Sequence, residues 1–132
     1  MPEGVDPVGA VEIAERLGVP PGTVRSWHHH RTLPPPAWRL HTAPFWNWPQ
    51  IVAWAIETGR LPADHPAPPA PPKRLPEIVG LAEIAERFGV SHRSVYDWAR
   101  GGRLPPHRWV RARTRLWLLS DLDFARKQRS LC

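Results

Sequence analysis

The chain has 132 residues, which is enough for one ordinary domain or for two very small ones. Lys and Arg number 18 against 12 Asp and Glu, and the formal net charge of +6 favours acidic partners, nucleic acid first. The single cysteine, Cys132, excludes an intrachain disulfide and indicates a reducing, cytoplasmic location. No apolar run approaches the ~20 residues of a membrane-spanning helix, and the amino terminus lacks the apolar segment of a signal peptide, so no membrane partner is expected.

Three helices are predicted in the first sixty residues. Apolar residues recur there at helical spacing, and Pro49 stands where the start of a helix tolerates proline. The apolar stripes are Ile13, Ala14 and Leu17 in the first helix, Val24 and Trp27 in the second, and Ile51, Trp54 and Ala55 in the third. We expect Trp27 and its counterpart Trp98 to lie in cores, and leave Trp38, Trp46 and Trp48 open between core and surface.

A Pro-rich segment follows. Between Pro62 and Pro76 nearly every second residue is Pro, which excludes a helix or a central strand and favours stiff polyproline II. At ~3.1 Å per residue such a segment spans roughly 45 Å. The sequence therefore predicts a linker at residues 63–77 between two modules, residues 1–62 and residues 78–132.

The second module begins with a pair of helices. Leu81, Ile84, Ala85 and Phe88 form an amphipathic stripe, and Gly89 is expected to end that helix. Ser91 is a good N-cap for the next helix, which buries Val95 and Trp98 and ends at Gly101-Gly102. Two helices joined by a three-residue turn are typical of a helix-turn-helix.

A basic hairpin and a last helix complete the prediction. Trp109 and Val110 are expected in one strand, residues 112–114 in a turn, and residues 116–119 in a second strand. Ser120 with Asp123 resembles a capping box that opens a helix containing Leu122 and Ala125.

The chain also repeats itself. VGAVEIAERLGV begins at Val8 and VGLAEIAERFGV at Val79, and the alignment that pairs these two valines continues without a gap beyond the second helix and into the hairpin. Trp27, Trp38 and Trp46 correspond in this alignment to Trp98, Trp109 and Trp117. A register kept over this length indicates two copies of one module.

Residues 81–126 resemble the winged helix-turn-helix domains of the MerR/excisionase (AlpA-like) family. The motifs that carry the resemblance are EIAERFGVS, VYDW, GRLP and the segment SDL after a basic hairpin. The first copy matches through VEIAERLGVPPGTVRSW and LPPP and then diverges. The resemblance implies a mainly α fold with small β-hairpin wings, here as two tandem winged helix-turn-helix modules. It also implies binding to double-stranded DNA, with the second helix in the major groove and the wing on the backbone or minor groove.

Candidate DNA-binding residues are polar side chains on the outer face of the second helix and in the wing. Arg93 and Arg100 suit guanine or phosphate, whereas Asp97 suits the N4 amino group of cytosine or orients one of these arginines. The candidates in the second copy are His92, Arg93, Tyr96, Asp97, Arg100, Arg103, Arg108, Arg111, Arg113 and Arg115. Those in the first copy are Thr23, Arg25, Ser26, His28, Arg31 and Arg39.

Charge distinguishes the two copies. Residues 79–129 contain 11 Lys and Arg against 5 Asp and Glu, while the rest of the chain contains 7 of each kind. The second copy is therefore expected to be the main DNA-binding part. In the first copy Arg31 stands at the position of Gly102, so a non-glycine residue must adopt the left-handed turn there or the loop must differ.

The sequence leaves several roles open. We interpret the protein as a transcription regulator or excision-control factor of a phage, mobile element or bacterium. Alternatively, the first copy, with Trp residues near its wing, docks a protein partner such as a recombinase, polymerase or terminase, or the chain is a DNA-packaging recognition subunit. Residues 28–30 are three consecutive His, but no further Cys or His stands at the spacing of a zinc site, so no metal is expected. The sequence also contains no nucleophile–base motif and no phosphate-binding loop, so neither a cofactor nor catalysis is expected.

Overall fold

The computed structural model describes residues 4–40, 43–111 and 114–122. The chain divides into two compact units, the first made by most of the residues up to Leu75 and the second by the residues from Pro76 onward. Each unit combines helices with a three-stranded antiparallel sheet. The fold class is therefore mixed α/β: the predicted helix pairs and hairpins are present, and each unit has one strand more than the prediction of a mainly α fold gave it.

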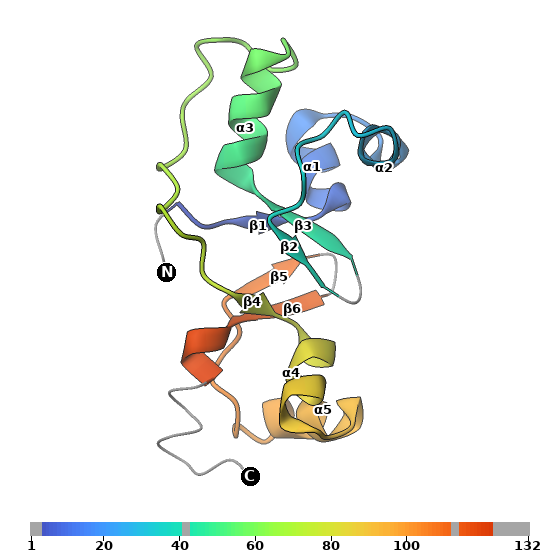
Figure 1. Ribbon diagram of the computed structural model, residues 1–132, viewed down its shortest axis with the longest axis vertical. Coiled ribbons are helices and arrows are strands. Elements are labelled where there is room, and N and C mark those ends of the chain that lie inside the picture. Colours follow the sequence, from blue (N-terminus) through green and yellow to red (C-terminus); the bar gives the residue numbers. More distant parts are fainter. Residues whose placement is uncertain (1–3, 41–42, 112–113, 123–132) are drawn as a thin grey trace. The chain divides into compact units, whose positions relative to one another are not determined.

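The first unit contains a helix pair, a sheet and a third helix (Figure 1). Its elements are β1 (Pro7–Val8), α1 (Ala10–Leu17), α2 (Pro21–His29), β2 (Trp38–Arg39), β3 (Pro44–Asn47) and α3 (Trp48–Glu57). The sheet order is β1-β3-β2, so the strand nearest the amino terminus pairs with the last strand of the unit. Proline occupies the first turn of both α2 and α3, where its missing N–H has no helical partner to lose.

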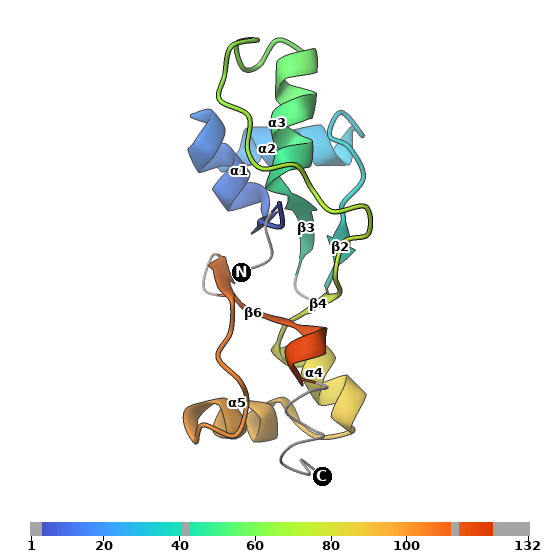
Figure 2. The same cartoon turned by 90° about the vertical axis from the view of Figure 1, so that its left-hand side faces the viewer.

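The second unit has the same order of elements (Figure 2). They are β4 (Ile78–Val79), α4 (Leu81–Phe88), α5 (His92–Arg100), β5 (Trp109–Arg111) and β6 (Thr114–Leu118). The sheet order is β4-β6-β5, and residues 119–122 are helical where the described residues end.

The predicted boundaries of the helix pair in the second unit are confirmed. Gly89 ends α4 in the left-handed conformation with φ 67°, and Gly102 adopts φ 75° just after α5. The Ser91 hydroxyl caps α5 by accepting a hydrogen bond from the backbone N–H of Ser94 at 3.2 Å. These local features explain why two short helices meet at a three-residue turn, since each end of the turn is specified by a residue suited to it.

A buried tryptophan occupies the centre of each sheet. Trp117 on β6 is 1% exposed, and its indole N–H donates a 2.9 Å hydrogen bond to the carbonyl of Pro105. Trp46 on β3 is equally buried and donates to the carbonyl of Pro34 at 2.7 Å. In each unit the indole joins the helix pair to the sheet and also satisfies a carbonyl in the Pro-rich segment that follows the second helix.

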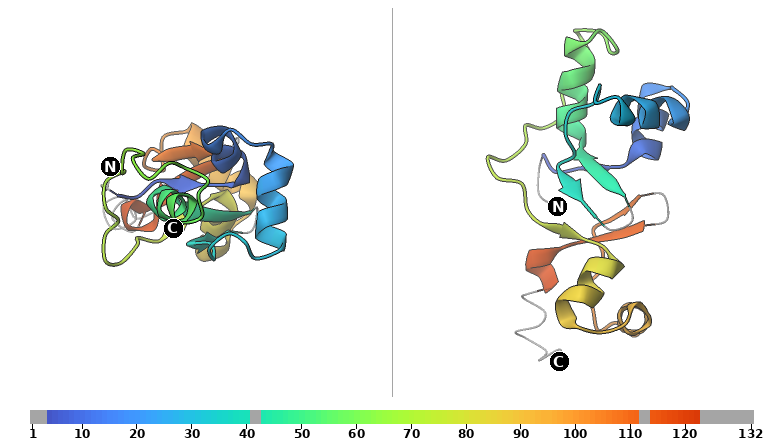
Figure 3. Two further views of the ribbon diagram at one scale, coloured as in Figure 1. Left: turned by 90° about the horizontal axis from the view of Figure 1, so that it is seen from above. Right: turned by 45° about the vertical axis from the view of Figure 1, so that its right-hand side comes forward.

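Other contacts recur at corresponding positions of the two copies. The Glu12 carboxylate accepts from the N–H of Gly9, as Glu83 does from Gly80. Strand pairing also matches, because the pairs Val8–Trp46 and Trp38–Phe45 in the first sheet correspond to Val79–Trp117 and Trp109–Leu116 in the second. Figure 3 shows the antiparallel strands of each unit from two further directions. Positions that match in sequence thus make matching contacts.

The structure corrects the prediction for the end of the hairpin. Thr114 belongs to β6 and pairs with Arg111 instead of lying in the turn. Leu119 begins the following helix instead of ending a strand, so Ser120 lies inside the first helical turn and is not the N-cap. Ala112, Arg113, Asp123 and Ala125 lie outside the described residues.

The tryptophans also differ from expectation. Trp46 and Trp38, left open by the sequence, are 1% and 8% exposed and belong to the core. Trp27 and Trp98, which were expected in cores, are half-buried and pack on the edge of those cores. The second helix of each pair presents its Trp at the rim because Val24 or Val95 fills the deepest position.

The Pro-rich segment is partly held against the first unit. Residues 62–77 contain neither helix nor strand. Gly4 adopts φ 79° and lies so close to this segment that a Cβ atom there would come within 2.1 Å of the Ala70 carbonyl oxygen. The segment is therefore not a free tether over its whole length.

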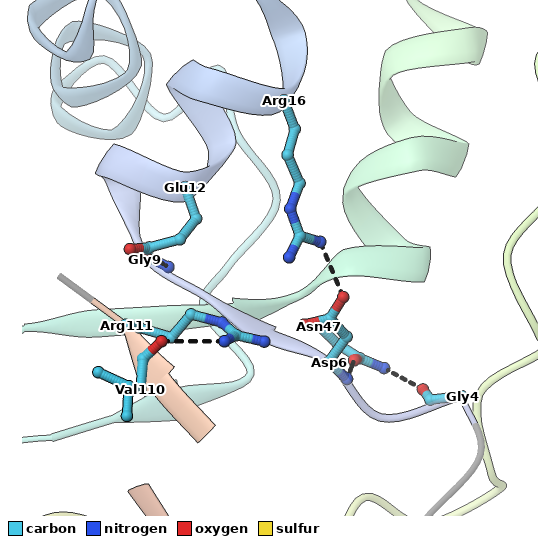
Figure 4. A network of polar contacts seen from close by, with 8 residues as sticks. All are labelled: Gly4, Asp6, Gly9, Glu12, Arg16, Asn47, Val110 and Arg111. Atoms are coloured by element: carbon cyan, nitrogen blue, oxygen red, sulfur yellow. Dashed lines mark hydrogen bonds and ion pairs between the residues drawn. The ribbon is translucent and has the colours of Figure 1, made fainter. Parts of the chain in front are cut away.

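A buried amide closes the first unit near its amino terminus (Figure 4). Asn47 is 2% exposed; its carbonyl oxygen accepts from the N–H of Asp6 at 2.8 Å, and its amide donates to the Gly4 carbonyl at 2.9 Å. Leu118 stands at the corresponding position of the second unit. The amide thus satisfies backbone groups that would otherwise be buried without partners.

We predict that Asn47→Leu lowers the free energy of unfolding by about 2–4 kcal/mol, because it leaves two backbone groups without a hydrogen-bond partner. Urea denaturation of the full chain measures this loss. Gln50→Leu, which removes an amide from the helix that follows without breaking a side-chain hydrogen bond, is the control and is expected to change stability by less than about 0.5 kcal/mol. Equal effects of the two substitutions would contradict the assignment.

Arg31 adopts φ 59°, which is the left-handed conformation. The sequence alignment with Gly102 predicted this conformation if both copies had the same turn after the second helix. A non-glycine residue in this region costs about 1 kcal/mol. We therefore predict that Arg31→Gly raises the melting temperature and that Gly102→Arg lowers it, each by the equivalent of about 1 kcal/mol. Thermal denaturation followed by circular dichroism measures both; shifts of the same sign would show that backbone strain does not control this turn.

Candidate nucleic-acid interface

The outer face of α5 presents a continuous stripe of polar side chains. Val95 is fully buried, and Trp98 is half-buried on the same side of the helix. The opposite side is exposed and consists of His92, Arg93, Tyr96, Asp97 and Arg100. These are the residues that the sequence placed on the outer face, and their exposure follows from the helical spacing of the buried residues.

Two of these side chains also border a cleft of about 380 Å³. His92 and Tyr96 line it from α5, while Thr114 and Arg115 line it from β6. The start of α4, residues 80–83, forms the remaining wall. The cleft thus brings the second helix of the helix-turn-helix beside the basic strand of the wing, so that one bound molecule can contact both.

The cations on this surface are available for a ligand. Within the described residues, neither Arg93 nor Arg115 forms an ion pair, and both side chains are exposed. The Cζ atom of Arg100 lies 6.0 Å from the ring centroid of Tyr96, a cation–π contact, and the side chain is exposed. Exposed guanidinium groups of this kind bind phosphate oxygens or the acceptor atoms of guanine.

Arg108 differs from the other candidates in the wing. Its Nε and Nη2 atoms donate to the two carboxylate oxygens of Asp121 at 2.8 and 3.2 Å. These hydrogen bonds, followed by the charge of Asp121, raise the pKa of Arg108, so its guanidinium stays charged wherever Asp121 is ionised. Arg108 therefore holds the wing to the helix that follows it. Sequence reasoning missed Asp121 as its partner, although Asp121 lies within the SDL segment.

The remaining wing candidates are less informative. Arg103 is exposed in the segment after Gly102, and Arg111 donates from Nη1 to the carbonyl of Val110 at 3.0 Å. Arg113 lies outside the described residues. Thr114, which the sequence did not single out because it was assigned to the turn, lines the cleft.

The first unit places its candidates differently. Arg25, Ser26, Arg31 and Arg39 are exposed, and Thr23 is half-buried. The His28 ring packs edge-on against Trp46 with 5.1 Å between ring centroids, so its position is set by the core.

The surface of the first unit that corresponds to the cleft lacks the histidine and the wing arginine of the second unit and has one arginine of its own. At the aligned positions, Pro21 replaces His92 and Pro44 replaces Arg115, and Arg25 replaces Tyr96. The helix-turn-helix of the first unit therefore presents fewer groups that can bind an anion.

Comparison with known proteins gives a family match in the second unit. Residues 79–129 match a family described as helix-turn-helix domain, so the second unit contains a helix-turn-helix domain of the DNA-binding kind. The matched segment includes α4, α5 and both strands of the wing. Neither the curated proteins nor the solved structures include a significant match to the chain. No helix among the described residues is long and apolar enough to span a membrane.

We predict that Arg115→Ala weakens binding to all duplexes about equally and reduces the salt dependence by about one phosphate contact, because a cation in the wing neutralises backbone charge. Arg108→Ala removes the same charge from the same hairpin and is the matched control. Since Arg108 is already paired with Asp121, we expect it to change the salt dependence less. Fluorescence anisotropy measures the affinity of both variants at salt concentrations from roughly 50 to 200 mM, the range in which such contacts are resolved. Equal slopes of log affinity against log salt concentration for the two variants would contradict the assignment.

Proposed function

We propose that the chain is a sequence-specific, double-stranded DNA-binding protein made of two tandem winged helix-turn-helix modules. Their boundaries are residues 1–62 and 78–132, joined by residues 63–77. The protein acts in transcription regulation or in excision control in a phage, mobile element or bacterium, without catalysing a reaction.

One observation above all supports binding through the second module. Its α5 face holds exposed cations that form no ion pair with the described residues, beside a cleft that Arg115 lines from the wing. A helix with base-reading side chains next to a basic strand suits a major groove and its flanking phosphates. The net charge of residues 79–129 adds long-range attraction to the same surface.

The tandem arrangement is supported by the contacts that recur at aligned positions of the two copies. The indole–carbonyl bonds of Trp46 and Trp117 and the matching sheet orders belong to these. Two modules in one chain can read two adjacent sites, and the second contributes most of the affinity because its cations outnumber its carboxylates, whereas those of the first do not.

An adaptor role for the first unit finds less support. Three of its tryptophans contact its own cations, since Arg60 lies 4.8 and 4.6 Å from the ring centroids of Trp27 and Trp54, and Arg16 lies 4.9 Å from that of Trp48. The large apolar side chains exposed in the described residues are Tyr96 and Val110, both in the second unit. An apolar docking face for a recombinase, polymerase or terminase is thus not evident on the described part of the first.

Selection of duplexes from a random library by the full chain, at one stated salt concentration, tests the proposal. We expect a preferred site, and we expect Arg93→Ala to lose roughly tenfold in discrimination against single-base variants of it. Arg25→Ala, the same change on the second helix of the first unit, is expected to have a smaller effect. Enrichment of no sequence would refute the proposal, and a larger loss from Arg25→Ala would exchange the roles of the two modules.

A further inference from the structure

Asp97 is the one carboxylate on the outer face of α5, a helix that the structure describes throughout. It is exposed and shares that face with Arg93 and Arg100. A neutral residue, Ser26, stands at the corresponding position of the first unit. On a surface that faces a polyanion, a carboxylate opposes binding unless it meets a hydrogen-bond donor.

The neighbouring arginines do not satisfy this carboxylate. Arg93 lies four residues before Asp97 and Arg100 three residues after it, spacings at which helical ion pairs form readily. Asp97 nevertheless forms no ion pair and no side-chain hydrogen bond with any described residue. A role in orienting either arginine is therefore not visible in the free protein, and the carboxylate oxygens are open to a ligand.

The major groove offers this acceptor few partners. A carboxylate only accepts hydrogen bonds, so the acceptor atoms of guanine and thymine repel it. Adenine presents its N6 amino group beside the acceptor N7, whereas cytosine presents the N4 amino group without an adjacent acceptor. Cytosine is thus the base that an Asp97 carboxylate favours most. Its pairing partner, guanine, is the base that an arginine on the same helix favours.

We propose that Asp97 determines specificity by accepting a hydrogen bond from the N4 amino group of a cytosine, and that its charge reduces binding to all other sequences. This inference rests on the proposed function, because it presupposes that α5 enters the major groove. A single carboxylate then acts in two ways: it is satisfied at the correct base pair, and it repels the duplex wherever that base pair is absent.

Asp97→Asn in the full chain tests the proposal. An amide has nearly the same shape but is neutral and both donates and accepts. We expect preference for cytosine at one base pair of the selected site to fall roughly tenfold, and affinity for random duplex to rise about threefold. Asp64→Asn changes the net charge equally at an exposed position remote from α5 in the sequence, and we expect it to alter neither quantity.

The outcomes separate the inference from the proposed function. If the unaltered chain selects no duplex sequence, the proposed function fails. If it selects a site and Asp97→Asn keeps the same preference at every base pair, the proposed function stands and the inference is overturned. A rise in random-duplex affinity that Asp64→Asn reproduces would overturn the second part of the inference, because net charge alone would then be responsible. Melting curves of both variants verify that the exposed substitutions leave the fold intact.

Discussion

The hydrogen bond from the Trp117 indole to the Pro105 carbonyl connects the parts of the second unit that a DNA-binding surface needs. The left-handed turn at Gly102 ends α5, the prolines that follow keep the next segment out of a helix, and Trp117 packs in one core with residues of the helix pair. Because the indole is buried, its N–H requires a hydrogen-bond acceptor, and the Pro105 carbonyl oxygen is that acceptor. The position of the wing relative to α5 therefore depends on this contact, and so does the cleft between Tyr96 and Arg115.

The same framework supports two different surfaces. The first unit repeats the indole–carbonyl bond with Trp46 and Pro34, yet some of its cations contact its own side chains, as Arg16 pairs with Asp6 at 2.7 Å and lies over the ring of Trp48. The second unit leaves Arg93 and Arg115 exposed. A shared core with divergent surface charge allows one chain to hold two modules of unequal affinity for an anionic partner.

Prediction succeeded where information was local. The stripe from Leu81 to Phe88, the Ser91 cap and the left-handed turn at Arg31 depend on residues within one or two turns of each other. Strands β1 and β4 were missed because two residues show no periodicity, and they exist only by pairing with strands that lie far along the chain, beyond the helix pair. Ser120 was misassigned as a cap for a related reason: the helix begins at Leu119, two residues before the predicted start, where the N–H of Leu119 bonds to the distant carbonyl of Glu77.

The amino-acid sequence by itself determined the internal repeat, the helix pairs and the excess of cations in the second copy, since spacing and composition do not depend on which residues are in contact. Only the tertiary structure decided which of those cations are free. Arg108 and Arg115 look alike in a basic hairpin, but Asp121, 13 residues from Arg108, binds the first, whereas the second faces the cleft. The physical reason is that an ion pair depends on distance in space, and the folding of β5 and β6 sets that distance.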